Sequence, residues 1–153
     1  MNDQQMVLDA IDRFLDKDVR PVAKALEQAD EYPHDIVSKM RDLGLFGATI
    51  GEQYGGLGLS ATVYAKIVER VSSVWMSVSG IFNSHLIMCA AIERFASESM
   101  KEHYLPRMAT GELRGGIALT EPDCGTDLQA IRTRAVHHND GYLINGTKQW
   151  ITN

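Results

Sequence analysis

Apolar residues in the first part of the chain recur at helical spacing. From Met6 to Val22 they are two to four positions apart, with charged residues between them. This period predicts an amphipathic helix with one apolar face. Pro21 lies inside the pattern and has no backbone N–H, so we expect either a kink there or two helices that meet near Arg20.

A second helix and a loop are expected next. Residues 34–43 carry apolar positions at helical spacing, and Gly44 after them is typical of a C-terminal cap. The stretch 47–60 has glycine at positions 51, 55, 56 and 58. So much backbone freedom is unsuited to the interior of an element and predicts a loop with turns.

Three more helices are expected before residue 112. Ser60 can cap one that continues to Val71. Residues 75–96 are apolar on nearly all sides of a helix, so this segment should be central in its domain. A last helix over 98–108 would end at Thr110-Gly111.

From Leu113 onward the pattern changes to short segments that mix β-branched and aromatic residues, which favour strands. Asn139-Asp140-Gly141 and Asn145-Gly146 are hairpin signals between the last three of these segments. The expected strands are 117–120, 131–137, 142–144 and 149–152. The sequence therefore predicts an α+β chain: an α-helical domain over 1–112, followed by the first strands of an antiparallel domain over 113–153. A sheet with such bare edges is a poor stopping place, so we expect a longer protein.

Composition excludes some classes of function. The formal charge is −5, with 44% hydrophobic and 23% charged residues and no basic run, so nucleic acid is not an expected partner. No uninterrupted apolar stretch approaches the roughly 20 residues that a membrane helix needs, so no transmembrane helix is expected. The polar, acidic start and the presence of only two cysteines, Cys89 and Cys124, favour a reducing cytoplasm.

The loop Leu119 to Asp127 is the most informative segment for chemistry. Pro122 fixes one dihedral angle, Gly125 can take a positive φ, and the neighbouring side chains are short and oxygen-bearing. Such a loop can direct several backbone N–H groups at one anionic phosphate. A ligand-free turn gives the same pattern, and the Asp123 carboxylate would repel phosphate.

A second candidate segment is Asn145 to Asn153. In a strand, Trp150 and Thr152 would share one face, where an indole and a hydroxyl can bind a planar heterocycle. A tryptophan that merely anchors the sheet is the alternative.

Together the two segments closely resemble the paired signatures of the acyl-CoA dehydrogenase family. The first signature is Leu119-Thr120-Glu121-Pro122-Asp123-Cys124-Gly125-Thr126-Asp127, and Trp150-Ile151-Thr152-Asn153 begins 24 positions after Thr126. Three further stretches are similar to family segments: Tyr54-Gly55-Gly56-Leu57-Gly58, Tyr104-Leu105-Pro106 and Thr110-Gly111-Glu112. The resemblance spans nearly the whole chain.

The resemblance implies an N-terminal helical domain, a middle barrel-like antiparallel β-domain, here truncated before completion, and a C-terminal helical bundle that is absent from this chain. It implies that FAD is the cofactor, with Thr120 near the pyrimidine edge of the flavin. Gly125 and Thr126 would lie toward the pyrophosphate and, for Thr126, the acyl-thioester substrate. The implied cofactor-binding residues are Ile117, Leu119, Thr120, Gly125, Thr126, Trp150, Ile151 and Thr152.

The resemblance implies roles for Trp150 and Thr152, and the sequence differs from the usual family residues at two positions of the loop. Trp150 would pack on the isoalloxazine, and Thr152 would hydrogen-bond near its N5 atom. The family usually has Gly where Asp123 stands and Ser where Thr126 stands, so Asp123 alters the charge of the loop while Thr126 keeps the hydroxyl.

The implied function is that of an oxidoreductase of fatty acid β-oxidation. It would convert an acyl-CoA to a trans-2-enoyl-CoA by hydride transfer to flavin N5 and pass electrons to an electron-transferring flavoprotein, as a tetramer when full length. The catalytic base would belong to the absent bundle, so this chain would hold no catalytic residue, Glu121 included, and would be inactive alone. Flavoprotein oxidases and monooxygenases of the same fold, or a non-catalytic helical fragment or interaction module, are the alternatives.

Other chemistry-bearing residues favour structural roles. His85 on the apolar helix is expected to be a hydrogen-bonded core histidine. His137 and His138 would point to opposite faces of a strand, so no metal site is expected. Cys89 should be a buried small hydrophobe, whereas the Cys124 thiol could be exposed.

Overall fold

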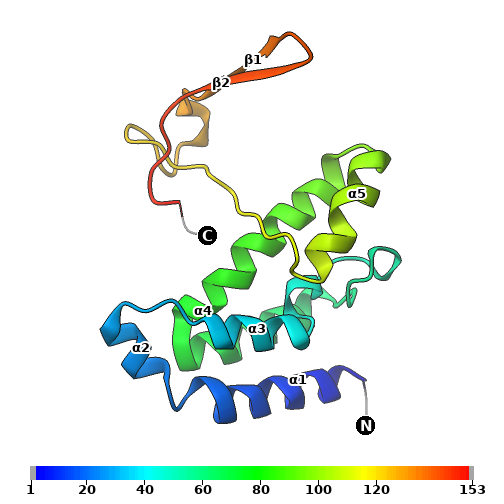
Figure 1. The fold of residues 1–153 in the computed structure, drawn as a ribbon, viewed down its shortest axis with the longest axis vertical. Coiled ribbons are helices and arrows are strands. Elements are labelled where there is room, and N and C mark those ends of the chain that lie inside the picture. The colour runs from blue at the N-terminus through cyan, green and yellow to red at the C-terminus, as the bar shows by residue number, and fades with distance from the viewer. Residues whose placement is uncertain (1–2, 152–153) are drawn as a thin grey trace. The chain divides into compact units, whose positions relative to one another are not determined.

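The computed structural model describes residues 3–151, and the chain divides into two compact units, 1–116 and 117–153. The first unit is built from helices, and the second carries a β-hairpin (Figure 1). In the described residues the chain is thus mostly helical with one two-stranded antiparallel sheet, which agrees with the α+β prediction.

The helical unit begins with two helices joined through a widened turn. Helix α1 (Asp3–Phe14) continues into the π-helical turn η1 (Leu15–Val19), and α2 (Ala23–Ala29) follows. The Arg20 N–H donates to the Leu15 carbonyl at 2.8 Å, five residues back. This wider turn precedes Pro21, which can neither donate a hydrogen bond nor continue a normal helix. The expected meeting of two helices near Arg20 is confirmed.

Helix α3 (His34–Asp42) and the glycine-rich loop also follow the prediction. Gly44 has φ +72°, and its N–H donates to the Arg41 carbonyl at 2.9 Å, which ends the helix. The loop contains two 3-10 turns, η2 (Leu45–Gly47) and η3 (Glu52–Tyr54).

The two helices expected over 60–71 and 75–96 form one bent element, α4 (Ala61–Phe95). Trp75 alone has extended backbone angles, φ −157° and ψ 102°, so the helix breaks there for one residue and resumes. The Trp75 indole N–H is satisfied by the Glu27 carboxylate of α2. Helix α5 (Glu98–Ala109) begins at Ser97, whose hydroxyl accepts the Met100 N–H, and Gly111 follows at φ +72°.

Helix α4 supplies the largest share of the core, as its apolar composition predicts. Its buried residues pack with buried side chains of α1, η1, α3, η2 and α5. By length and composition α4 could also cross a membrane, which a count of uninterrupted apolar residues does not reveal. Because its buried face belongs to this core, we interpret α4 as the central helix of the unit.

In the second unit, β1 (Arg134–His138) pairs with β2 (Gly141–Asn145) in antiparallel register, with Val136 opposite Leu143. The turn is Asn139-Asp140, with Asn139 at φ +51°, so the first hairpin signal is confirmed. The second is wrong, because Asn145-Gly146 ends β2 and Gly146 lies against the Thr133 side chain.

The strands expected at 117–120 and 149–152 do not form in the described residues. One backbone hydrogen bond joins these segments, from the Gln149 N–H to the Thr120 carbonyl at 2.9 Å. A strand requires a ladder of such bonds. The short 3-10 turn η4 (Leu128–Ala130) lies between the loop and β1.

Candidate functional site

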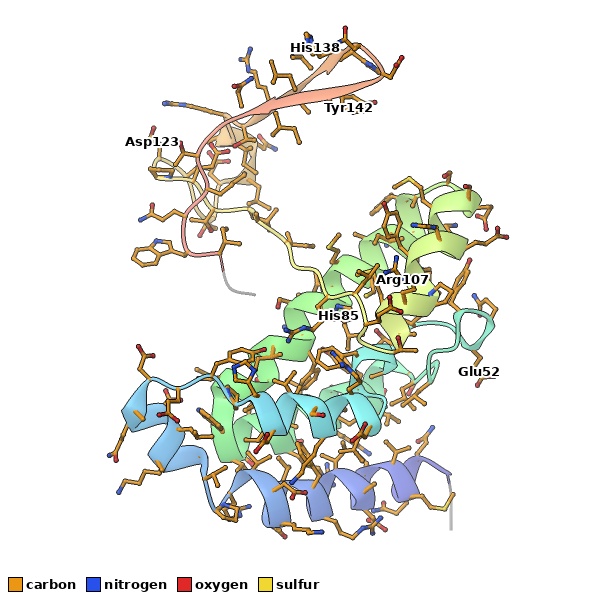
Figure 2. The ribbon with its side chains drawn as sticks, viewed as in Figure 1. Glu52, His85, Arg107, Asp123, His138 and Tyr142 are labelled. Carbon is orange, nitrogen blue, oxygen red and sulfur yellow. The ribbon has the colours of Figure 1, made fainter. Side chains whose placement is uncertain are left out.

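The loop 119–127 is built on a tight turn. The Glu121 N–H donates to the Cys124 carbonyl at 2.9 Å, and the Cys124 N–H returns to the Glu121 carbonyl at 3.2 Å. Pro122 and Asp123 form the tip, where Asp123 is labelled in Figure 2. The Cys124 side chain is buried, so the exposed thiol that the sequence allowed is not found. Pro122, Asp123 and Gly125 are exposed, whereas Cys124 and Glu121 are buried.

The Glu121 carboxylate is buried and fully engaged. Oε2 accepts the Arg132 N–H at 2.7 Å, and Oε1 accepts the Thr133 N–H at 2.9 Å. The Lys148 ammonium lies 3.0 Å from Oε1. The Thr133 side chain, the two N–H groups and this cation hold the pKa of Glu121 down at about 2. A carboxylate so stabilised in its charged form is a poor proton acceptor.

Lys148 and Gln149 bring the two sequence signatures together. Lys148 Nζ donates to the Leu119 carbonyl at 3.0 Å, in addition to its ion pair with Glu121. Gln149 donates its N–H to the Thr120 carbonyl at 2.9 Å. Lys148 was not among the site residues predicted from the sequence. A lysine close to the second signature and a glutamate, Glu121, in the first could have indicated an ion pair between them.

The rest of the loop leaves hydrogen-bond donors available. Within the described residues, no hydrogen bond joins the N–H groups of Gly125, Thr126 or Asp127 to another protein group, and all three residues are exposed. A Cβ placed on Gly125 would meet nothing within 4 Å. The Asp123 carboxylate pairs with the Arg132 guanidinium at 2.9 Å, so its negative charge is partly compensated.

The Trp150 segment differs from the expected strand. Trp150 has φ +58° and is 82% exposed, and Ile151 is also exposed. The expected shared strand face of Trp150 and Thr152 is therefore wrong for Trp150, and Thr152 lies outside the described residues. In the part of the chain that the structure describes, no strand pairs with residues 149–151, so no ladder of hydrogen bonds holds Trp150 in an extended conformation.

The remaining predicted site residues occupy mixed environments. Ile117 and Thr120 are half-buried, and Leu119 is exposed. The structure thus brings Leu119 and Thr120 to the Lys148-Gln149 segment. Within residues 3–151, no hydrogen bond or ion pair connects Gly125 or Thr126 with Trp150 or Ile151.

Two family models match this chain, and both signatures lie within the second match. The model described as "Acyl-CoA dehydrogenase, N-terminal domain" matches residues 1–112, and "Acyl-CoA dehydrogenase, middle domain" matches residues 116–153. The chain belongs to the acyl-CoA dehydrogenase family. The resemblance drawn from the two motifs is thereby confirmed.

Curated relatives cover this chain almost completely. It is 36% identical to an acyl-CoA dehydrogenase of Bacillus subtilis (strain 168) over 152 residues, 99% of this chain and 40% of the relative. The same figures hold for a short-chain specific acyl-CoA dehydrogenase of Clostridium acetobutylicum. The chain therefore spans about 40% of the length of these relatives.

Solved structures of family members share the fold. Butyryl-CoA dehydrogenase from Megasphaera elsdenii superposes with a TM-score of 0.86 at 30% identity, covering 97% of this chain and 40% of that chain. An acyl-CoA dehydrogenase of Bacillus anthracis complexed with FAD superposes with a TM-score of 0.85 at 33% identity, covering 100% of this chain and 27% of that chain. A chain from a study of the electron transferring flavoprotein of Acidaminococcus fermentans has a TM-score of 0.89 at 34% identity. The match covers 97% of this chain and 39% of that chain.

In the helical unit His85 is a core residue, as expected. It is fully buried on α4 (Figure 2), and its Nδ1 accepts the Gly115 N–H at 3.3 Å. Nε2 therefore carries the proton and donates to the Phe46 and Met108 carbonyls, each at 3.1 Å. Burial lowers the pKa of His85, which keeps the ring neutral. Cys89, one turn further along α4, is buried too.

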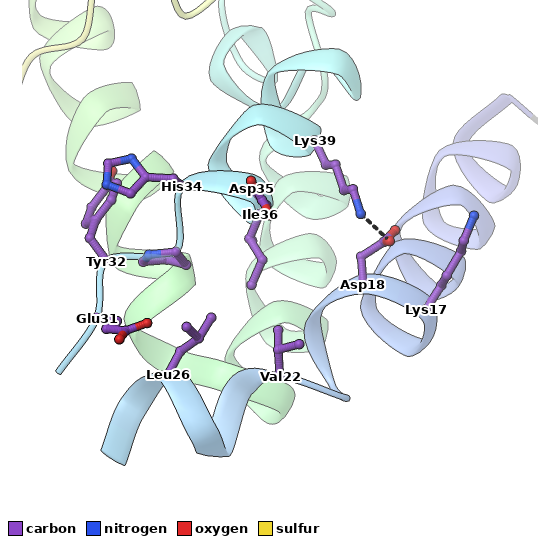
Figure 3. Close-up of a pocket in the computed structure, with 11 residues that line it drawn as sticks. Lys17, Asp18, Val22, Leu26, Glu31, Tyr32, His34, Asp35, Ile36 and Lys39 are labelled. Atoms are coloured by element: carbon purple, nitrogen blue, oxygen red, sulfur yellow. Dashed lines mark hydrogen bonds and ion pairs between the residues drawn. The ribbon is translucent and has the colours of Figure 1, made fainter. Parts of the chain in front are cut away.

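A hollow of about 450 Å³ lies between η1, α2 and the start of α3. Figure 3 shows Val22 and Leu26 below Ile36, and a dashed line joins Lys39 to Asp18. The Lys39 ammonium donates to the Asp18 carboxylate at 2.6 Å. Among residues 3–151, no three His, Cys, Asp or Glu side chains gather where they could hold a metal ion. None of the described residues that line the hollow belongs to the two signatures.

Proposed function

We propose that this chain is the N-terminal part of an FAD-dependent acyl-CoA dehydrogenase that converts an acyl-CoA to a trans-2-enoyl-CoA. One observation carries the proposal beyond family membership: Lys148 and Gln149, directly before the second signature, contact Leu119 and Thr120 of the first. Residues proposed for one cofactor thus belong to one local framework.

The residues present fit a flavin dinucleotide. The available N–H groups of Gly125, Thr126 and Asp127 suit an anionic pyrophosphate. The exposed indole of Trp150 suits a planar ring. Ile117, Leu119, Thr120, Ile151 and Thr152 would complete the contacts, and the Thr126 hydroxyl would lie toward the thioester. Bound FAD would accept the hydride that leaves the β-carbon of the acyl group.

Glu121 does not serve as the catalytic base in this proposal. Both of its oxygens accept hydrogen bonds from backbone N–H groups, and Lys148 neutralises the charge. The base that removes the α-proton would come from sequence that the longer relatives have and this chain does not. The chain of 153 residues alone is therefore expected to be inactive.

The test uses the protein encoded by the complete gene. We expect it to purify with bound FAD and to reduce an artificial electron acceptor when acyl-CoA substrates are added. The 153-residue chain, assayed in parallel, should show no acyl-CoA-dependent reduction. A complete protein that is colourless and takes up no added FAD would disprove the proposal.

The same assay separates the alternatives. Rapid reoxidation of the flavin by oxygen during turnover would identify an oxidase or monooxygenase of this fold. Acceptance of electrons only by an electron-transferring flavoprotein would support the dehydrogenase. Acyl-CoA-dependent activity in the 153-residue chain itself would exclude a non-catalytic helical module.

Partners and location are part of the proposal. We propose an electron-transferring flavoprotein as the electron acceptor, a homotetramer for the complete protein, and a cytoplasmic location. Both cysteines are free, which suits a reducing compartment. Analytical ultracentrifugation of the complete protein and fractionation of its source cells test the last two points.

A further inference from the structure

We propose that Glu121 and Lys148 are positioning residues, whose ion pair fixes the loop 119–127 and the segment 147–151 in one arrangement for the flavin. The proposal rests on the proposed function. It concerns two side chains that the predicted cofactor-binding set does not include. All the contacts of this ion pair lie within the second unit.

Glu121 connects the loop to the approach of β1. Its backbone closes the turn with Cys124, while its carboxylate accepts the N–H groups of Arg132 and Thr133. Two adjacent N–H groups bound by one carboxylate fix the chain direction where it leaves the loop. The carboxylate is only 6% exposed, and a buried charge requires such partners together with a cation.

Lys148 supplies that cation and connects the second segment. Its side chain is 23% exposed, and its ammonium contacts both Glu121 Oε1 and the Leu119 carbonyl at 3.0 Å. With the Gln149 to Thr120 hydrogen bond, two successive residues make three polar contacts to residues 119–121. The two segments are therefore attached at several points rather than one.

Trp150 depends on this attachment. It directly follows Gln149, has φ +58°, and its side chain is largely exposed, so little else in the described residues orients the indole. Without the Lys148 ammonium, the Gln149 to Thr120 hydrogen bond alone would hold the segment, and Glu121 would lose its cation. We expect the relative position of Trp150 and the loop to become variable.

The test compares variants of the complete protein. Lys148→Met removes the ammonium and keeps an unbranched side chain, while Lys148→Arg keeps a cation that can contact both acceptors. Arg134→Met is the matched control, because Arg134 is an exposed cation on β1 of the same unit. The readouts are the FAD dissociation constant, from flavin fluorescence, and the visible circular dichroism of bound flavin, which reports its surroundings.

We expect Lys148→Met to weaken FAD binding by about tenfold or more. The groups that contact the flavin would be displaced, and even a small displacement caused by a remote substitution weakens such contacts strongly. Its flavin circular dichroism should change, whereas Lys148→Arg and Arg134→Met should retain the wild-type constant within about threefold. If Lys148→Met does not fold, Lys148→Gln, which keeps a donor for Leu119, replaces it with the same expected direction.

Two failures can be distinguished. A wild-type protein that binds no FAD overturns the proposed function itself. A wild-type protein that binds FAD, with a Lys148→Met variant of unchanged affinity and circular dichroism, overturns only the positioning role. If Lys148→Met loses FAD and Lys148→Arg binds it equally weakly, the ion pair is not the cause of the loss.

Discussion

At the scale of single residues, two buried polar groups organise the two units by different means. Glu121 is charged and surrounded by donors, whereas His85 is neutral and holds three backbone groups from separate segments. His85 thereby links η2, α5 and the chain after α5 to α4. Each group needs all its partners because unpaired buried polar atoms are costly.

Replacement of His85 tests this linkage. His85→Leu preserves approximate size but leaves the Phe46 carbonyl, the Met108 carbonyl and the Gly115 N–H without their partner. We expect a loss of about 2–3 kcal/mol in the free energy of unfolding, measured by urea denaturation with far-UV circular dichroism. The control His103→Leu, at an exposed position of α5, should change it by less than about 0.5 kcal/mol. Equal effects of the two substitutions would contradict the role of His85.

The pKa of His85 also predicts a direction for pH dependence. Burial, with a smaller effect of the Arg114 charge, lowers its folded-state pKa below the usual 6.5, so the unfolded chain binds the proton more readily. Its contribution to stability is complete above about pH 6.5 and is lost as the pH falls through the folded-state pKa. The urea midpoint of the wild type should therefore decrease from pH 7.5 to 5.5 more steeply than that of His85→Leu. Parallel curves would show that His85 is not responsible.

At the scale of elements, the glycine-rich loop is shaped by a close backbone approach. Residues 57–59 return along 47–50 through three backbone hydrogen bonds, between Leu57 and Gly47, Gly58 and Ile50, and Leu59 and Ala48. A Cβ on Gly56 would collide with the Ile50 carbonyl, whereas one on Gly55 would meet nothing within 4 Å. Gly55 instead requires φ +79°.

These adjacent glycines give a matched pair of substitutions. Gly55→Ala should lower the free energy of unfolding by about 1–2 kcal/mol, because a residue with a Cβ would have to adopt the left-handed conformation. Gly56→Ala should cost at least about 1 kcal/mol more, because the backbone itself must move. Urea denaturation measures both. A smaller loss for Gly56→Ala would contradict the close approach.

Helix caps permit a second test at this scale. The Ser60 hydroxyl accepts the Val63 N–H at the first turn of α4. Ser60→Ala should lower the free energy of unfolding by about 1 kcal/mol. Ser99→Ala, at an exposed position inside α5, should leave it unchanged or raise it slightly, because alanine is the better helix former. Thermal unfolding of the two variants measures the difference.

At the scale of the whole molecule, the two units differ in how much they bury. The continuous core belongs to the helical unit, while every residue of β1 and β2 is exposed. A two-stranded hairpin without a covered face is only marginally stable. In the 153-residue chain, we expect amides of β1 and β2 to exchange with solvent at least about a hundredfold faster than those near Ile67 in α4. Equal protection measured by hydrogen exchange would show that the hairpin shares the stability of the core.

The sequence by itself determined the features that depend on neighbouring residues. The helical periods, the Ser60 cap, the Gly44 terminus and the Asn139-Asp140 turn were all predictable because their causes lie within a few positions of the chain. The two signatures were enough to identify the family, since motif spacing is a property of sequence.

Only the tertiary structure decided features that depend on distant partners. Trp75 interrupts α4 while its indole N–H contacts Glu27, 48 residues away, and no local pattern indicates this. Among residues 3–151, segments 117–120 and 149–151 have no neighbouring strand to pair with, so they are not strands. Cys124 is buried rather than exposed, and Lys148 reaches Glu121 and Leu119. Burial and ion pairing are set by which segments meet in space, which the local sequence does not encode.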